Sequence, residues 1–139
     1  MPEIRFNVPG EATGKGRPRS TKSGTVYTPQ QTRSAEMFVT LCAKVAMGSR
    51  PLLAGPVRVS IWISVGIPAS WPKVRKARAL SNLDRPTGNP DIDNVAKLIA
   101  DAMNGVVYAD DKAIVDLSIS KMFGEVPCVS VIVKTLNHE

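Results

Sequence analysis

The stretch VRVSIWISV, residues 57–65, decides the fold class of this chain. Valine and isoleucine alternate with arginine, serine and tryptophan along it, which is the period of a strand with one buried face. Shorter stretches at 4–8, 115–119 and 129–133 alternate in the same way and predict three further strands. A chain of several short alternating strands predicts a sheet that is largely antiparallel and has one face against a core.

The longest helical pattern follows the first strand. Thr28 is a suitable N-cap with Pro29 at the first helical position, and Gly48 is a natural end. Three large residues four apart predict the apolar face of this helix: Met37, Leu41 and Val45. The long loop that precedes it, residues 9–25, is rich in glycine and basic residues.

A second main helix is expected from about Asp91 to Asn104-Gly105, because its apolar residues recur at i, i+3, i+4 and i+7. A short basic helix is expected near residues 70–80, opened by Ser70-Trp71-Pro72. We therefore predict an α+β fold in which residues 1–139 form a single domain. Its sheet is mostly antiparallel or mixed, and the two main helices pack on one face.

Composition narrows the function classes. The apolar share of 43% is ordinary for a globular protein, and no apolar run is long enough to cross a bilayer. The first residues lack the pattern of a secretory signal, so we expect a cytoplasmic protein with no membrane contact. Cys42 and Cys128 are expected to be two buried thiols. Because His138 is the only histidine, any hydrolytic chemistry depends on carboxylates, lysine and bound metal.

The net charge of +6 suits a polyanionic partner, and the basic residues gather in two places. We expect both groups to contact the DNA backbone, although solvated surface is the alternative for each. The first group is Lys15, Arg17 and Arg19, and the second is Lys73, Arg75 and Lys76. Trp71, beside the second group, is either a wedge for DNA or a packing anchor, and its serine and proline neighbours favour packing.

The acidic residues at the start of the second main helix carry the chemical signal. Asp91 and Asp93 alone are ordinary helix-capping residues. If the chain enters the helix extended, however, both carboxylates point the same way, and they repel unless a cation relieves them. Lys97 lies one turn after Asp93 on the same helix face. It is therefore either a surface ion-pair residue or a contact to a scissile phosphate.

A second acidic pair, Asp110-Asp111, follows the same helix. Adjacent aspartates in a turn are usually solvated. If residues 105–108 run back extended along the helix, Asp111 reaches the level of Asp91 and Asp93. A set of oxygen ligands without histidine or cysteine suits Mg²⁺ or Mn²⁺, which hydrolyse phosphodiesters in many proteins.

These segments resemble a known family. PDIDNVAK at 90–97, followed by DAMNGVVYADD at 101–111, closely resembles the signature of the RusA family of Holliday junction resolvases, the crossover junction endodeoxyribonucleases of phages and prophages. The resemblance implies a homodimeric, Mg²⁺-dependent endonuclease, with Mn²⁺ as a substitute, that makes paired nicks across four-way DNA junctions in recombination and repair. It also implies that the catalytic residues are Asp91, Asp93, Lys97 and Asp111, with the three aspartates as metal ligands. Asp110 matches the first aspartate of the family's pair.

Two alternatives stand beside this prediction. One is a nuclease that uses the same carboxylates on another branched DNA. The other is a non-catalytic DNA-binding accessory protein of recombination, in which the acidic residues cap helices and turns. Lys97 among the carboxylates argues against the second, because a protein that only binds DNA gains nothing from acidic groups near phosphates.

Overall fold

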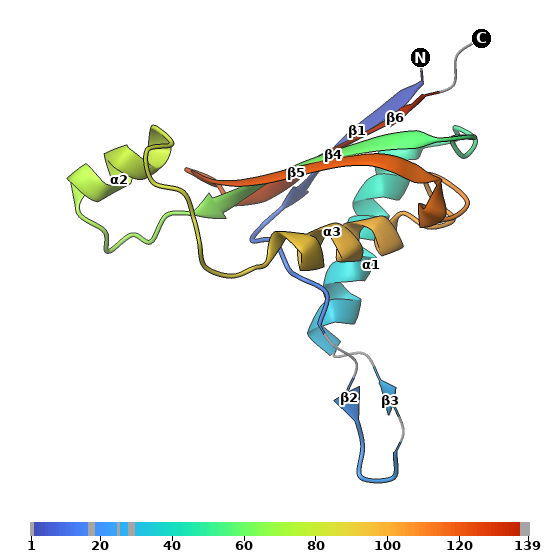
Figure 1. The fold of residues 1–139 in the computed structure, drawn as a ribbon, viewed down its shortest axis with the longest axis horizontal. Coiled ribbons are helices and arrows are strands. Elements are labelled where there is room, and N and C mark those ends of the chain that lie inside the picture. Colours follow the sequence, from blue (N-terminus) through green and yellow to red (C-terminus); the bar gives the residue numbers. More distant parts are fainter. Residues whose placement is uncertain (1, 17–18, 25, 28–29, 137–139) are drawn as a thin grey trace.

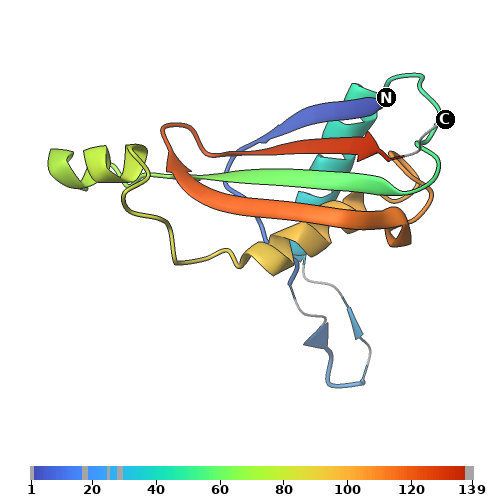
Figure 2. The same cartoon turned by 45° about the horizontal axis from the view of Figure 1, so that its top comes forward.

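The computed structural model describes residues 2–16, 19–24, 26–27 and 30–136. Its main sheet has the strand order β1 (Glu3–Pro9), β6 (Cys128–Thr135), β4 (Val57–Gly66) and β5 (Ile114–Gly124). Helices α1 (Gln30–Met47) and α3 (Ile92–Ala102) lie on the same side of this sheet (Figures 1 and 2). The predicted α+β fold with two main helices on one face is confirmed.

The strand directions make the sheet mixed. β6 is antiparallel to both of its neighbours, β1 and β4. β4 and β5 are parallel, and the chain between them includes α2 (Lys73–Leu80), α3 and the 3₁₀ turn η1 (Asp111–Ala113). A parallel pair needs such a long crossover, because a tight turn reverses the strand direction. The crossover carries the predicted acidic residues.

The core lies between the sheet and the two helices. Alternate residues of β4 and β6 are buried, as their sequence pattern predicts: Val57, Val59, Ile61 and Ile63 on β4, and Val129, Val131 and Val133 on β6. Helix α3 buries the face that its sequence period predicts, including Val95, Ala96 and Ile99. Because this face is fixed against the sheet, the polar side of α3 faces outward.

Helix α1 is turned relative to our expectation. Met37, Leu41 and Val45 are 72%, 56% and 75% exposed, so they do not form the core-facing side. The buried residues of α1 are instead Thr32, Val39, Ala43 and Met47. Mostly small and medium side chains allow α1 to pack closely on the sheet and on α3, which leaves Met37, Leu41 and Val45, together with the partly exposed Phe38, in contact with solvent.

The remaining elements are small. Strands β2 (Arg19–Ser20) and β3 (Val26–Tyr27) form a hairpin that projects from the main body (Figure 1). The predicted cap, Thr28-Pro29, lies outside the described residues. Cys42 and Cys128 are free, half-buried thiols rather than fully buried ones, and burial raises the pKa of Cys42. Among the described residues, no helix is long and apolar enough to cross a membrane.

Candidate active site

The outer face of α3 carries a stripe of charged residues. Asp93, Lys97 and Asp101 are four residues apart, so they lie one above another on the same side of the helix. Asp91 is the N-cap, with an extended backbone of φ −69° and ψ 134°, as expected for a chain that enters the helix extended. The side chain of Asn94 donates a hydrogen bond of 3.4 Å to the Asp91 carboxylate.

Asp111 lies beside the last turn of α3. Its carboxyl group lies next to that of Asp101, and each affects the pKa of the other. The expectation that residues 105–108 run back extended is wrong. They form a compact turn, in which the Gly105 amide donates to the Tyr108 carbonyl over 2.8 Å. Tyr108 is buried and its hydroxyl donates to the Ala100 carbonyl over 2.7 Å, which anchors the turn at the end of the helix.

Negative charge concentrates at this end of the stripe. Burial, then the adjacent Asp101 and Asp110 carboxyl groups, raise the pKa of Asp111. Burial also opposes ionisation of Asp101, but its ion pair with Lys15 and the nearby Lys97 hold the Asp101 pKa below its usual value. Carboxyl groups that crowd one another in this way favour a bound cation.

The donor chemistry of these residues fits a hard divalent cation, because each carboxylate offers oxygen ligands only. Within the part of the chain that the structure describes, no three acidic, histidine or cysteine side chains are grouped closely enough to hold one metal ion. Asp91, Asp93 and Asp111 therefore do not form a single cage. Mg²⁺ rarely needs one, since it is usually held by one or two carboxylates together with water and substrate phosphates.

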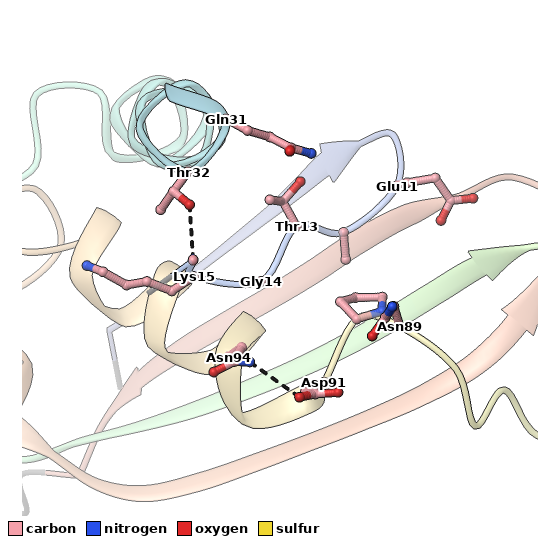
Figure 3. A pocket seen from close by; sticks show the side chains of 12 residues that line it. Glu11, Thr13, Gly14, Lys15, Gln31, Thr32, Asn89, Asp91 and Asn94 are labelled. Carbon is pink, nitrogen blue, oxygen red and sulfur yellow. Dashed lines mark hydrogen bonds between the residues drawn. The ribbon is translucent and has the colours of Figure 1, made fainter. Parts of the chain in front are cut away.

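Asp91 stands at the edge of an open hollow of about 690 Å³ (Figure 3). Its walls are the loop at residues 11–16, the start of α1 and the start of α3. The polar side chains that line it include Glu11, Gln31, Asn89 and Asn94. The hollow is large and polar enough to accept part of a nucleic-acid strand next to Asp91.

The segment that leads into α3 is held by Lys121 on β5. The Lys121 ammonium group donates to the carbonyls of Gly88 over 2.6 Å and Pro90 over 3.0 Å. The Lys121 carbonyl accepts two bonds from the Arg85 guanidinium, of 3.2 and 2.7 Å. These contacts place the residues directly before Asp91, so β5 helps to position the acidic end of the helix.

Comparison with known proteins shows the family of the chain. The family model described as Endodeoxyribonuclease RusA matches residues 9–134. The chain belongs to the RusA endodeoxyribonuclease family. It is also similar to the uncharacterized protein YqaN of Bacillus subtilis (strain 168), with 37% identity over 139 aligned residues that cover 96% of this chain and 97% of the relative. The resemblance carried by the acidic segments is thus confirmed over nearly the whole chain, and family membership supports a nuclease.

The two predicted groups of basic residues in this RusA family member have different surroundings. Lys15 is paired with two carboxylates, Glu36 and Asp101. Arg17 and the side chain of Arg19 lie outside the described part of the chain. Lys73, Arg75 and Lys76 belong to α2, which projects beyond the end of the sheet (Figure 2).

Trp71 at the start of α2 is a packing residue, as its neighbours predict. Its ring meets Phe123 of β5 edge to face, with the centroids 5.3 Å apart. The guanidinium carbon of Arg75 lies 3.5 Å from the centre of the Trp71 ring, a cation–π contact. These contacts attach α2 to the end of β5, where Lys73 is exposed.

Sequence reasoning missed Asp101 and Lys121 as parts of the site. A signal for Asp101 was present, because it continues the spacing of four residues from Asp93 and Lys97. No local pattern could reveal Lys121, since its partners are 31 and 33 residues away along the chain.

Proposed function

We propose that this chain is a Mg²⁺-dependent endonuclease that resolves four-way DNA junctions by paired nicks. The observation that carries the proposal is the charged stripe Asp93–Lys97–Asp101 on α3, with Asp91 at one end and Asp111 at the other. It lies on the exposed side of a helix whose opposite side is fixed in the core. Family membership supports the same class of reaction.

The proposed roles follow from position. Asp91, Asp93 and Asp111 are the proposed metal ligands, each acting together with water and substrate phosphates and not as one cage, and the metal when bound would provide a hydroxide nucleophile and offset charge on the phosphate. Lys97 is exposed and, among the described residues, forms no ion pair within 4.0 Å, so its ammonium group is free to bind a phosphate oxygen. It lies between Asp93 and Asp101, where it stabilises the charge that develops during hydrolysis.

Helix α2 is the proposed contact with the DNA backbone. It has no acidic residue in its first turn, and Lys73 lies exposed on it. Arg78 is already paired with Asp84, whose two oxygens each accept a bond of 3.1 Å. The residues available for phosphate contacts are therefore Lys73, Arg75 and Lys76, and binding through them should weaken as salt rises.

A second copy of the chain is expected, because paired nicks need two active sites and one chain offers one. Two-fold symmetry matches the near two-fold symmetry of a junction. The exposed α1 residues Met37, Leu41 and Val45 are the apolar surface that we expect to contribute. If two α1 helices pair antiparallel about Leu41, Met37 of one copy faces Val45 of the other. Strand β4 offers no edge, since β6 and β5 flank it on both sides.

A nicking assay tests the proposal. The wild-type chain is incubated with a synthetic four-way junction in Mg²⁺ and in EDTA, beside linear duplex and replication-fork controls. We expect symmetric nicks on the junction in Mg²⁺ only. Cutting of the fork in preference to the junction would favour a nuclease of another branched DNA. Tight junction binding without any cutting would favour the non-catalytic accessory protein.

A further inference from the structure

Lys15 is committed to carboxylates and is not an open contact for DNA. Its ammonium nitrogen lies 2.5 Å from an Asp101 oxygen and 3.2 Å from a Glu36 oxygen. The side chain is only 26% exposed, and those of Glu36 and Asp101 are 32% and 21% exposed. In Figure 3 it extends away from Asp91 and along α3. A phosphate would have to displace two carboxylates that already neutralise this ammonium group.

The backbone around Lys15 is fixed by the same two helices. The Lys15 amide donates to the Asn94 carbonyl over 3.0 Å, and the Gly16 amide donates to the Thr32 hydroxyl over 3.0 Å. At Gly14 a Cβ atom would lie 3.0 Å from the Cβ of Asn94, so the loop passes very close to α3. The loop that places the Lys15 ammonium group at Asp101 is therefore itself hydrogen-bonded to α3 near Asp91.

Asp101 connects Lys15 to the acidic end of the stripe, at the last turn of α3. It pairs with Lys15 on one side and lies next to the Asp111 carboxyl group, whose pKa it raises, on the other. The Thr40 hydroxyl donates to the neighbouring Ala102 carbonyl over 2.8 Å, which ties α1 to the same turn. Without Lys15, Asp101 and Asp111 would face each other with one cation fewer, and their repulsion would move them apart.

We infer that Lys15 is a positioning residue, which through Asp101 holds the Asp111 carboxyl group in place for the reaction. This inference rests on the proposed function, because it takes Asp111 to be a metal ligand. It assigns opposite tasks to two lysines of similar charge. Lys15 positions a carboxyl group of the active site, whereas Lys73 contacts the DNA backbone.

Lys15→Met tests the inference, with Lys73→Met as the comparison and Lys134→Met, on the opposite face of the sheet, as the control for charge. Two quantities are measured that do not need cleavage: Mn²⁺ affinity of the free protein, and junction affinity in Ca²⁺ as a function of salt. For Lys15→Met we expect Mn²⁺ affinity to fall about tenfold, the cost typical of removing an outer partner of a metal ligand. Its junction affinity and salt slope should match those of the Lys134→Met control.

For Lys73→Met we expect the reverse result: unchanged Mn²⁺ affinity and a salt slope reduced by about 1. Lys15→Arg should restore Mn²⁺ affinity, because a guanidinium group can pair with both carboxylates. Should Lys15→Met fail to fold, Asp101→Asn replaces it, with the same expected loss of Mn²⁺ affinity. The inference is overturned if Lys15→Met lowers the salt slope as Lys73→Met does, or if Mn²⁺ affinity is unchanged in both Lys15→Met and Asp101→Asn.

Cleavage by the wild type distinguishes a failure of the proposed function from a failure of the inference about Lys15. If the wild type does not cut the junction, the proposed function fails, while the ratio of Mn²⁺ affinities still decides the role of Lys15. If the wild type cuts and Lys15→Met cuts about tenfold to a hundredfold more slowly at saturating junction, both hold. If the wild type cuts and Lys15→Met cuts equally fast, only the inference fails.

Discussion

Lys121→Met should loosen the entrance to α3 without removing any predicted catalytic group. The ammonium group of Lys121 makes two hydrogen bonds to backbone carbonyls, at Gly88 and Pro90. A hydrogen bond from a charged donor contributes roughly 1.5–3 kcal/mol. Lys121 is half-buried and water can replace part of its contacts, so we take about 1.5–3 kcal/mol for the pair rather than for each bond.

The expected change in melting temperature follows from the size of the domain. An unfolding entropy of about 2.1 cal/mol/K per residue gives roughly 0.3 kcal/mol/K for this chain. The loss of 1.5–3 kcal/mol then lowers the melting temperature by about 5–10 °C. The bonds from Arg85 survive the substitution, because they go to the Lys121 backbone carbonyl. The loop should therefore loosen at Pro90 and not detach entirely.

Calorimetry and junction cleavage measure the two consequences. Displacing the start of α3 by about 1 Å should slow cleavage on the order of a hundredfold, because Asp91 and Asp93 move with it. Lys134→Met serves as control and should change the free energy of unfolding by no more than about 0.5 kcal/mol. The prediction would be refuted by a Lys121→Met variant that cuts at the wild-type rate and melts within about 2 °C of the wild type, a difference comparable to the experimental error.

The other predictions concern the metal, the lysine and the dimer. Asp93→Asn should bind the junction at least as tightly as the wild type and fail to cut it, since it removes both a ligand and a negative charge near phosphate; cutting within about tenfold of wild type speaks against the metal site. Lys97→Ala should lose most cleavage at saturating junction, and near-normal turnover would make Lys97 a solvated surface residue. Cleavage should require Mg²⁺ or Mn²⁺ and be poorly supported by Ca²⁺, whose looser shell positions a nucleophile badly; robust cutting in EDTA would end the metal hypothesis. Leu41→Glu should convert a sedimenting dimer into a monomer at micromolar concentration, because it places a charge at the centre of the apolar surface of α1; an unchanged dimer would place the interface elsewhere.

Strands β1, β4 and β6 and helix α3 could be predicted because their patterns are strict, whereas the alternating Val115 and Leu117 of β5 are exposed. In β4 every second residue is apolar, and in α3 the apolar residues occupy one side only, so each pattern has a single way to bury its face. In α1 apolar residues occur on several sides. Size favoured Met37, Leu41 and Val45 as the inner face, whereas close packing selected Val39, Ala43 and Met47.

Other features of the fold and the site could not be predicted from local sequence patterns. The alternation in β5 is the same whether it runs parallel or antiparallel to β4, so strand direction could not be predicted from it. The position of Asp111 depends on the buried Tyr108, which fixes a compact turn where an extended segment was expected. Lys15 looked like a phosphate contact because its partner Asp101 is 86 residues away. The sequence thus predicted candidate site residues by type, while the contacts among them needed the folded chain.

The place of β6 in the sheet has a consequence for how the protein is made. β6 is the last strand among the residues that the structure describes, yet it lies between β1 and β4, and β1 has no other partner in the main sheet. During synthesis β1 therefore waits unpaired until residues 128–135 leave the ribosome, while β4 and β5 can already pair with each other. A nascent chain stalled before Cys128 exposes two strand edges at once, which are sites for aggregation or chaperone binding. Folding of the sheet is therefore completed only when β1 and β6 meet.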